Sequence, residues 1–245
     1  MVLAKVDADS LENDTANSPI FANTFKLATI YRYTMISTQH YLKLPNRDKL
    51  QKLCKSISVI EAIIAEDWLD RYYSYNSKWA DQEEFCEMRN GQGDSLQILF
   101  HRDGCVINGM THDYYPQDKS KLTEGLPKIY KEFIFGEPVH SIGTTFCIWT
   151  NDQNIWQIGN ADNHNNGSEE MLEIFDGDPN TYIAWAADYY EDRFVINENT
   201  LNVITGIYQG KLLTTSMSIS INKAISHWTQ LQEDLREISY PGNIS

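Results

Sequence analysis

Apolar residues recur with a helical period over residues 46–66. They form one stripe when the stretch is drawn as a helix: Leu50, Leu53, Cys54, Ile57, Ile60 and Ile64. Asn46 is a residue type that caps helix N-termini. The opposite side carries several basic residues. The pattern predicts an amphipathic helix over 46–66 whose apolar stripe is buried.

Strand patterns follow this helix. Polar and aromatic residues alternate in the first of them, and in two places a short polar loop separates two apolar runs. One of these loops ends in Asp103-Gly104, which is typical of a β-hairpin. Between the first two strands, 82–89 is predicted as a short helix. Strands are predicted at 71–79, 95–100, 105–111, 144–150 and 154–159.

The remaining segments have helical patterns. Ser168 is expected to cap one helix and Gly177 to end it, while Asp178-Pro179 is typical of the start of the next. The helices are expected near 126–135, 168–177, 178–190, 200–208 and 221–238. The predicted fold class is therefore α+β: an antiparallel meander sheet with helices packed on one face and a helical C-terminal part.

The domain organisation is expected to be simple. Residues 1–20 are polar and acidic without a period, and we expect a flexible tail there. Residues 21–245 are expected to form a single α+β domain. Segment 21–42 is compatible with a helix or a strand, and a division into a sheet part and a helical part near 160–168 remains an alternative.

Composition narrows the classes of partner. The chain has 245 residues and a net charge of −14, which disfavours binding to nucleic acid or to anionic lipid. The sequence contains neither a secretion signal nor an apolar run of about 20 residues. Three of the four cysteines lie in apolar runs, so the thiols are expected to be buried and reduced. These features predict a cytoplasmic protein, and no motif indicates a cofactor.

The negative charge is concentrated in one segment. Between Gly159 and Glu198 there are ten acidic residues, and Arg193 is the one Lys or Arg, which gives −9 out of −14. Some of these acids stand at predicted helix starts, where negative charge is favoured. The others are predicted to form an acidic binding face for a basic protein partner: Glu173, Asp176, Asp188, Glu191 and Asp192.

An alternative site is the strand predicted at 71–79. Its alternate positions would place an arginine among aromatic rings on one face of the sheet, an arrangement that suits an anionic or sugar-like ligand. The residues of this alternative groove are Arg71, Tyr73, Tyr75 and Trp79. Aromatic residues that simply cover the sheet would give the same pattern.

Two further patterns are weaker. Residues 162–173 match most of a calcium-binding loop, but His164 stands where a hard-cation ligand is needed and a strand is predicted before the loop. We therefore expect a polar loop and no metal site. His112-Asp113, at the end of a predicted strand, is either a general-base pair or a solvated strand end.

Four segments carry a resemblance to known sequences. They begin at Arg71 (RYYSYNSKW), Met88 (MRNGQGD), Thr144 (TTFCIW) and Phe175 (FDGDP). Together they resemble a family of uncharacterised bacterial α+β proteins without an established activity, over about residues 45 to 241. In size and acidity the chain is also similar to bacterial immunity proteins, which neutralise toxins.

Taken together, these features favour a non-enzymatic interaction protein, an immunity-like inhibitor that presents an acidic face to a basic partner. The alternative is a small-molecule binder or enzyme that uses the groove on strand 71–79. A pocket that contains Arg71 together with converging carboxylates would favour the second hypothesis. The sequence identifies neither the partner nor the oligomeric state.

Overall fold

The computed structural model describes residues 35–114, 117–160 and 165–244. From Ile36 onward, these residues belong to one compact unit. The expected tail at 1–20 and most of segment 21–42 lie outside the described residues.

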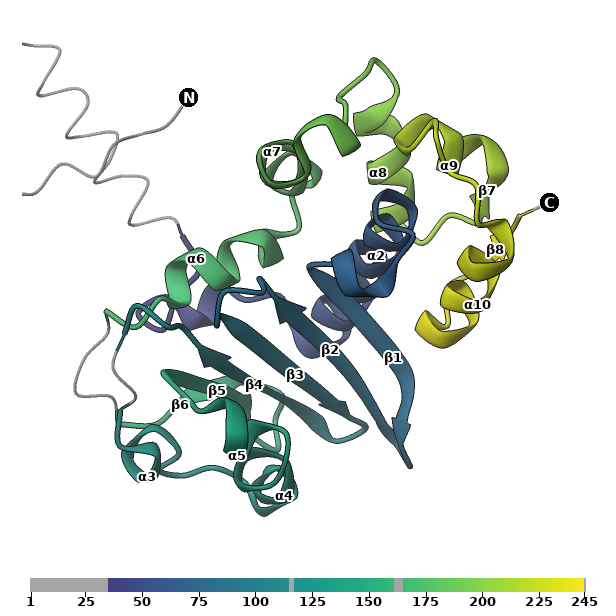
Figure 1. Cartoon of the computed structure of the whole chain (residues 1–245). Coiled ribbons are helices and arrows are strands. Elements are labelled where there is room, and N and C mark those ends of the chain that lie inside the picture. Colours follow the sequence, from purple (N-terminus) through teal and green to yellow (C-terminus); the bar gives the residue numbers. More distant parts are fainter. Residues whose placement is uncertain (1–34, 115–116, 161–164, 245) are drawn as a thin grey trace, which may run out of the picture. The chain divides into compact units, whose positions relative to one another are not determined.

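A six-stranded antiparallel sheet, with its strands in chain order, runs through this unit (Figure 1). Its strands are β1 (Tyr73–Ala80), β2 (Glu83–Arg89), β3 (Ser95–His101), β4 (Gly104–Met110), β5 (Phe146–Thr150) and β6 (Trp156–Ile158). The antiparallel meander and all five predicted strands are confirmed. The hairpin at Asp103-Gly104 has the expected tight turn, since His101 pairs with Gly104.

The helix predicted at 82–89 is wrong, because this segment is strand β2. It pairs along its whole length with β3 and over most of its length with β1. Phe85 and Cys86 are both buried, on opposite faces of the sheet. Two neighbouring strands thus override a sequence that is rich in helix-forming glutamate. In the turn before β2, Gln82 has a positive φ. Gly and Asn are the residues that usually adopt this conformation in a hairpin turn, and neither occurs there, so no residue in the sequence signalled the turn.

Both faces of the sheet are buried. On one face, Leu96, Ile98 and Phe100 join the main core under the long helices, whereas Leu99 belongs to a second core on the other face. The long helices pack on one face of the sheet, as predicted. Short helices lie against the second face (Figure 1): α3 (Lys119–Leu122), α4 (Lys131–Phe135) and α5 (Val139–Ile142).

The first long helix, α2 (Arg47–Ile64), lies across the sheet (Figure 1). Its N-cap is Asn46, whose side chain accepts a hydrogen bond from the N–H of Lys49 at 3.0 Å, as predicted. Every residue of the predicted apolar stripe is buried. The four cysteines are buried and unpaired with one another in disulfides, three of them in the main core around α2.

The C-terminal part is helical, as predicted. Its helices are α6 (Ser168–Leu172), α7 (Pro179–Tyr190), α8 (Thr200–Tyr208), α9 (Thr215–Ile221) and α10 (Trp228–Ile238). Short 3₁₀ turns accompany the fold: η1 (Tyr41–Lys43), η2 (Trp68–Asp70), η3 (Lys128–Tyr130), η4 (Glu173–Asp176) and η5 (Glu191–Arg193). Strands β7 (Leu213–Thr214) and β8 (Gly242–Asn243) form a small parallel pair. Asp178 caps α7 with Pro179 in its first turn, as expected.

Two helix boundaries differ from the prediction. Gly167, and not Ser168, occupies the cap of α6. Ser168 is the first residue of the helix, and its hydroxyl accepts a hydrogen bond from the N–H of Thr38 at 3.0 Å. The helix predicted at 221–238 is interrupted between α9 and α10. Within this break, the Asn222 side chain donates to the carbonyl of Ile63 at 2.8 Å, so contacts with the end of α2 replace helical bonds.

Candidate functional site

A buried ion pair ties the end of α2 to β1 and α10. The guanidinium of Arg71 donates to the backbone carbonyls of Ala65 (2.8 Å) and Glu66 (3.0 Å) and to the carboxylate of Asp234 (2.7 Å). The side chains of Arg71 and Asp234 are only 5% and 6% exposed. Loss of either partner would leave an unpaired buried charge, so this pair fixes the mutual position of the three elements.

Glu66 fixes the start of α10. Its carboxylate accepts hydrogen bonds from the backbone N–H groups of Ser226 (3.0 Å) and His227 (2.5 Å). Burial pushes the pKa of Glu66 upward, but these hydrogen bonds outweigh that effect and leave the pKa below its ordinary value. Glu66 therefore stays ionised at neutral pH. Its carboxylate lies beside the segment that separates α9 from α10.

An open hollow of about 1230 Å³ lies among these elements. Three stretches of the chain line it, within 64–70, 192–193 and 222–233. Five of the lining residues are carboxylates: Glu66, Asp67, Asp70, Asp192 and Glu233. Against them stand Arg193 and His227, and the guanidinium of Arg193 already pairs with Asp70 at 3.0 Å. We call this feature the acidic hollow.

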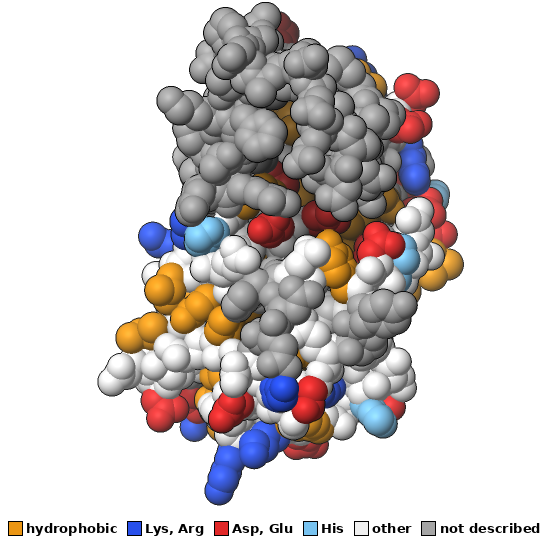
Figure 2. Space-filling view, turned by 90° about the vertical axis from the view of Figure 1, so that its left-hand side faces the viewer, with side chains coloured by type: hydrophobic (Ala, Val, Ile, Leu, Met, Phe, Trp, Pro, Cys, Tyr) orange, Lys and Arg blue, Asp and Glu red, His pale blue; other side chains and the backbone are white. Residues whose placement is uncertain are grey.

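The shape of the acidic hollow strengthens its electrostatic effect. A concave surface lined by charges of one sign concentrates the field above it and attracts ions of the opposite sign. Trp68 and Trp228 add aromatic surface to the lining. Along the lower edge of the face in Figure 2, blue and red side chains lie next to each other, so acidic and basic residues are mixed there.

The acidic face predicted from the sequence meets the hollow at one residue, Asp192. Glu173, Asp176, Asp188 and Glu191 do not line it. Asp176 has a structural role that the sequence did not reveal, because its carboxylate accepts hydrogen bonds at the start of α7. The donors are the Thr181 hydroxyl (2.5 Å) and the N–H of Asp178 (2.7 Å).

Most carboxylates of the hollow therefore come from segments that the charge count overlooked. Asp67 and Asp70 follow α2 directly, and Glu233 lies on α10, more than 160 residues later in the chain. No local pattern links these positions. The sequence did offer one signal for this hollow: Asp67 and Asp70 flank Trp68 just after the predicted helix, where acids beside a tryptophan can form a binding surface.

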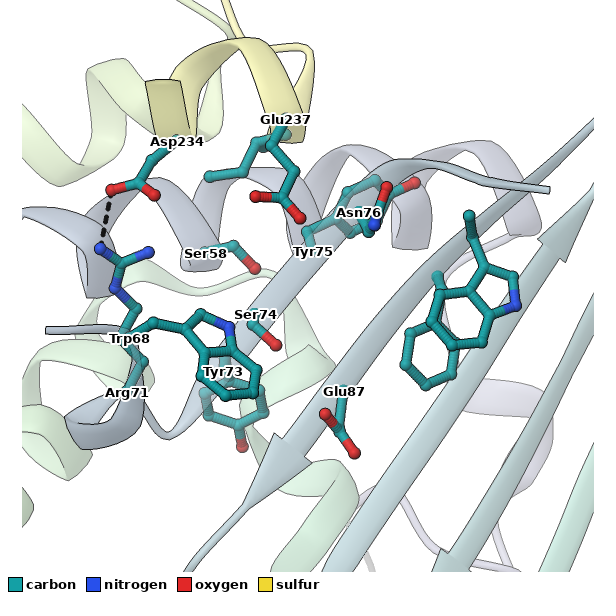
Figure 3. A pocket seen from close by; sticks show the side chains of 13 residues that line it. Ser58, Trp68, Arg71, Tyr73, Ser74, Tyr75, Asn76, Glu87, Asp234 and Glu237 are labelled. Carbon is teal, nitrogen blue, oxygen red and sulfur yellow. Dashed lines mark hydrogen bonds and ion pairs between the residues drawn. The ribbon is translucent and has the colours of Figure 1, made fainter. Parts of the chain in front are cut away.

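A second, smaller pocket of about 110 Å³ lies beside β1 (Figure 3). We call it the β1 pocket. All four residues of the alternative groove line it, together with groups from α2, η2, β2 and α10: Arg71, Tyr73, Tyr75, Trp79, Ser58, Trp68, Ser74, Asn76, Phe85, Glu87, Asp234, Glu237 and Ile238. Trp68 lines both hollows.

The geometry changes what the alternative groove can bind. Tyr73 and Tyr75 are buried in the main core. Trp79 lies within the irregular part of β1, between Asn76 and Ala80, and stacks on Phe85 with ring centres 4.4 Å apart. The guanidinium of Arg71 is already engaged by Asp234 and two carbonyls. The β1 pocket does bring Arg71 together with the carboxylates of Glu87, Asp234 and Glu237, which is the arrangement that favours the small-molecule alternative. The charge of Arg71 is neutralised by Asp234 within the fold, so Arg71 is not free to anchor an anionic ligand.

A third group of interest is buried and belongs to the core. The carboxylate of Glu61 on α2 accepts hydrogen bonds from the Tyr182 hydroxyl (2.7 Å), the Tyr190 hydroxyl and the N–H groups of Tyr72 (2.9 Å) and Tyr73 (3.2 Å). Burial raises the pKa of Glu61. This network joins α2, β1 and α7. The presence of a carboxylate at position 61 is thus explained by its role in the fold.

The two weaker sequence patterns have clear surroundings. His112 lies between two carboxylates, with Nδ1 at 2.8 Å from Asp94 and Nε2 at 3.3 Å from Asp113, and the hydrogen bond to Asp94 raises its pKa. Residues 162–164 of the calcium-like loop lie outside the described residues, and the strand β6 precedes the loop. Within the described part of the chain, no three His, Cys, Asp or Glu residues are grouped so that they could hold a metal ion.

Comparisons with protein-family models, curated proteins and solved structures find no match to this chain. The family resemblance therefore remains a prediction. Among the helices of the described residues, none has the length and apolar character that crossing a membrane requires. The two hollows at the junction of α2, β1 and α10 are therefore the candidate binding sites.

Proposed function

We propose that this chain is a non-enzymatic interaction protein whose acidic hollow binds a basic segment of a protein partner. The observation that carries the proposal is the convergence of five carboxylates from three distant stretches on one open concavity. Glu66, Asp67 and Asp70 also bond within the fold, whereas Asp192 and Glu233 have no partner among the described residues. Solubility alone gives these two acids no reason to converge with the others on a concave region. A basic segment that entered the hollow would meet ionised groups on several sides.

The remaining lining supports a protein partner. Trp68 is 47% exposed, and Trp228 is partly exposed, so the hollow offers aromatic surface beside the carboxylates. Tryptophan is enriched at the energetically important positions of protein interfaces, and its ring attracts Lys and Arg side chains. The four buried thiols suit a reducing compartment, so we place the proposed interaction in the cytoplasm.

The test uses oligolysine and oligoarginine peptides of equal length as probes, with affinities measured by titration calorimetry. We expect the wild-type protein to bind both peptides at low ionic strength and to lose affinity steeply as salt is added. Asp192→Lys together with Glu233→Lys should weaken binding more than tenfold, because two attractive charges in the hollow become repulsive.

The matched control is Glu132→Lys with Glu198→Lys, which changes the net charge equally at two exposed positions outside the hollow. We expect this control to weaken binding by less than about threefold. Equal losses in the two double variants would contradict the proposal, because the net charge alone would then account for the affinity. The same holds if the wild-type protein binds neither peptide.

A further inference from the structure

The β1 pocket contains a buried hydroxyl that nothing in the described structure satisfies. Ser58 on α2 is 2% exposed, and its Oγ has no hydrogen-bond partner among the described residues. This residue lines the pocket, and Figure 3 shows it facing the space between α2, β1 and α10. An unpaired buried hydroxyl is unfavourable, so its presence at a pocket wall indicates that a polar group enters there.

The other polar groups favour a positively charged occupant. Glu87 and Glu237 both line the pocket, and Figure 3 shows their carboxylates at opposite ends of it, with Ser58 and Ser74 between them. Arg71 and Asp234 neutralise each other. Glu87 contacts Arg89 at 3.3 Å, but Glu237 and the Ser58 hydroxyl remain to accept hydrogen bonds from a cation.

Aromatic walls add to this preference. Trp68 and Trp79 are 47% and 42% exposed, and both line the pocket. The guanidinium of Arg89 covers one face of Trp68, 3.9 Å from its ring centre, and Trp79 stacks on Phe85, so the remaining exposed ring surface is what an incoming side chain can contact. Aromatic faces beside carboxylates form an environment that recognises ammonium groups, and they can pack against the alkyl chain that carries such a group.

The size of the pocket discriminates among cations. A volume of about 110 Å³ holds several water molecules and thus the end of one side chain. An ammonium group is compact and donates three hydrogen bonds in a tetrahedral arrangement, which suits acceptors on different walls. A guanidinium is larger and planar and prefers paired coplanar acceptors. Lysine is therefore the better match.

We propose that the β1 pocket receives the ammonium group of a lysine side chain from the basic segment bound in the acidic hollow. This inference rests on the proposed function and names the residue type that the site prefers. Trp68 lines both cavities, so a peptide in the hollow has the pocket directly beside it. The Ser58 hydroxyl and the Glu237 carboxylate accept hydrogen bonds from the incoming ammonium group.

The test compares oligolysine with oligoarginine by titration calorimetry on the wild-type protein and on Ser58→Ala with Glu237→Gln. We expect the wild-type protein to bind oligolysine about tenfold more tightly, and the double variant to bind both peptides about equally. Removing an unsatisfied hydroxyl should not destabilise the fold, so thermal unfolding of Ser58→Ala serves as the check on integrity. Glu132→Gln is the matched control for the lost charge and should keep the preference for lysine.

The outcomes separate the two proposals. Loss of all peptide binding in Asp192→Lys with Glu233→Lys, together with an unchanged lysine preference in Ser58→Ala with Glu237→Gln, would overturn the pocket assignment alone. Equal wild-type affinities for the two peptides would overturn it as well. Peptide binding that is insensitive to the hollow reversals would overturn the proposed function, and with it the inference that rests on it.

Discussion

Carboxylates occur in two opposite environments in this molecule. Glu61 lies in the core and accepts four hydrogen bonds from two tyrosine hydroxyls and two backbone N–H groups. The acids of the hollow border open space, and Arg193 and His227 are the basic residues described around them. In the first environment the fold supplies four donors to one carboxylate. In the second, Glu66, Asp67 and Asp70 bond within the fold, whereas the carboxylates of Asp192 and Glu233 have no partner among the described residues.

The difference shows how a structural acid can be separated from a functional one. A buried carboxylate survives only if the fold supplies its partners, so a complete set of donors explains why it is present. Asp192 and Glu233 are exposed, and their removal should cost the fold little. Acids whose removal should cost little stability, and which come together from different segments of the chain, are better explained by binding to a partner than by a role in the fold.

The largest expected effect comes from placing a carboxylate next to Glu61 without supplying donors. Ile60 is fully buried in the main core, one residue from Glu61 on α2. Ile60→Asp should therefore lower the free energy of unfolding by about 4 kcal/mol or more and should unfold the protein under ordinary conditions. Leu53→Asp, on the same stripe, should act in the same way.

Urea denaturation followed by circular dichroism measures this effect. Lys52→Asp is the control, because it places the same side chain on the exposed side of α2 and should change the free energy of unfolding by less than about 1 kcal/mol. If Ile60→Asp melts like the wild-type protein, the helix stripe is not the core that the structure describes.

Sequence patterns predicted the frame around the hollow better than the hollow itself. The stripe of α2 and the strand alternation are local, and burial of one face follows from them. Strand β2 was missed because its pairing comes from two neighbours that local propensity does not reveal. The interruption between α9 and α10 depends on Glu66 and Asn222, which contact residues more than 150 positions away.

The same reasoning applies to the candidate sites. The four residues of the alternative groove do gather in one pocket, because neighbouring positions on a strand stay close in any fold. The acidic hollow combines positions near 67, 192 and 233, and only tertiary structure brings these together. A count of charge along the chain found Asp192 but had no means of finding its companions.

A smaller effect is expected when the donors around Glu61 stay and the charge is removed. Glu61→Gln can direct its carbonyl oxygen at the Tyr190 hydroxyl and the two N–H groups, and its amide at the Tyr182 hydroxyl. We expect a loss of about 1–2 kcal/mol in the free energy of unfolding, against about 3–5 kcal/mol for Glu61→Leu. Glu61→Leu removes the shared acceptor of all four donors and leaves the N–H of Tyr72 with only the Tyr190 hydroxyl, at 3.2 Å.

The pH dependence gives this prediction a sign. Burial raises the pKa of Glu61 above its ordinary value of 4.5, so above pH 4.5 the folded state keeps a proton that the unfolded state has released. The wild-type free energy of unfolding must then fall as pH rises through that window. Glu61→Gln lacks this titration, so the difference between wild type and variant should shrink with rising pH. A difference that grows instead would show that the hydrogen bonds outweigh burial and lower the pKa.

The smallest expected effect concerns the acids of the hollow. Asp192→Asn with Glu233→Gln removes two charges and keeps the shape of the side chains. Because like charges in the hollow repel one another, we expect the free energy of unfolding to change by less than about 0.5 kcal/mol, with a slight gain at low ionic strength that disappears as salt is added. Urea denaturation at low and high salt measures both quantities, and Glu132→Gln with Glu198→Gln controls for net charge. A loss above about 1 kcal/mol would mean that these carboxylates hold the fold together as Glu61 does. The contrast between a satisfied core acid and acids available to a partner would then fail, and with it the main physical reason for placing a basic segment in the hollow.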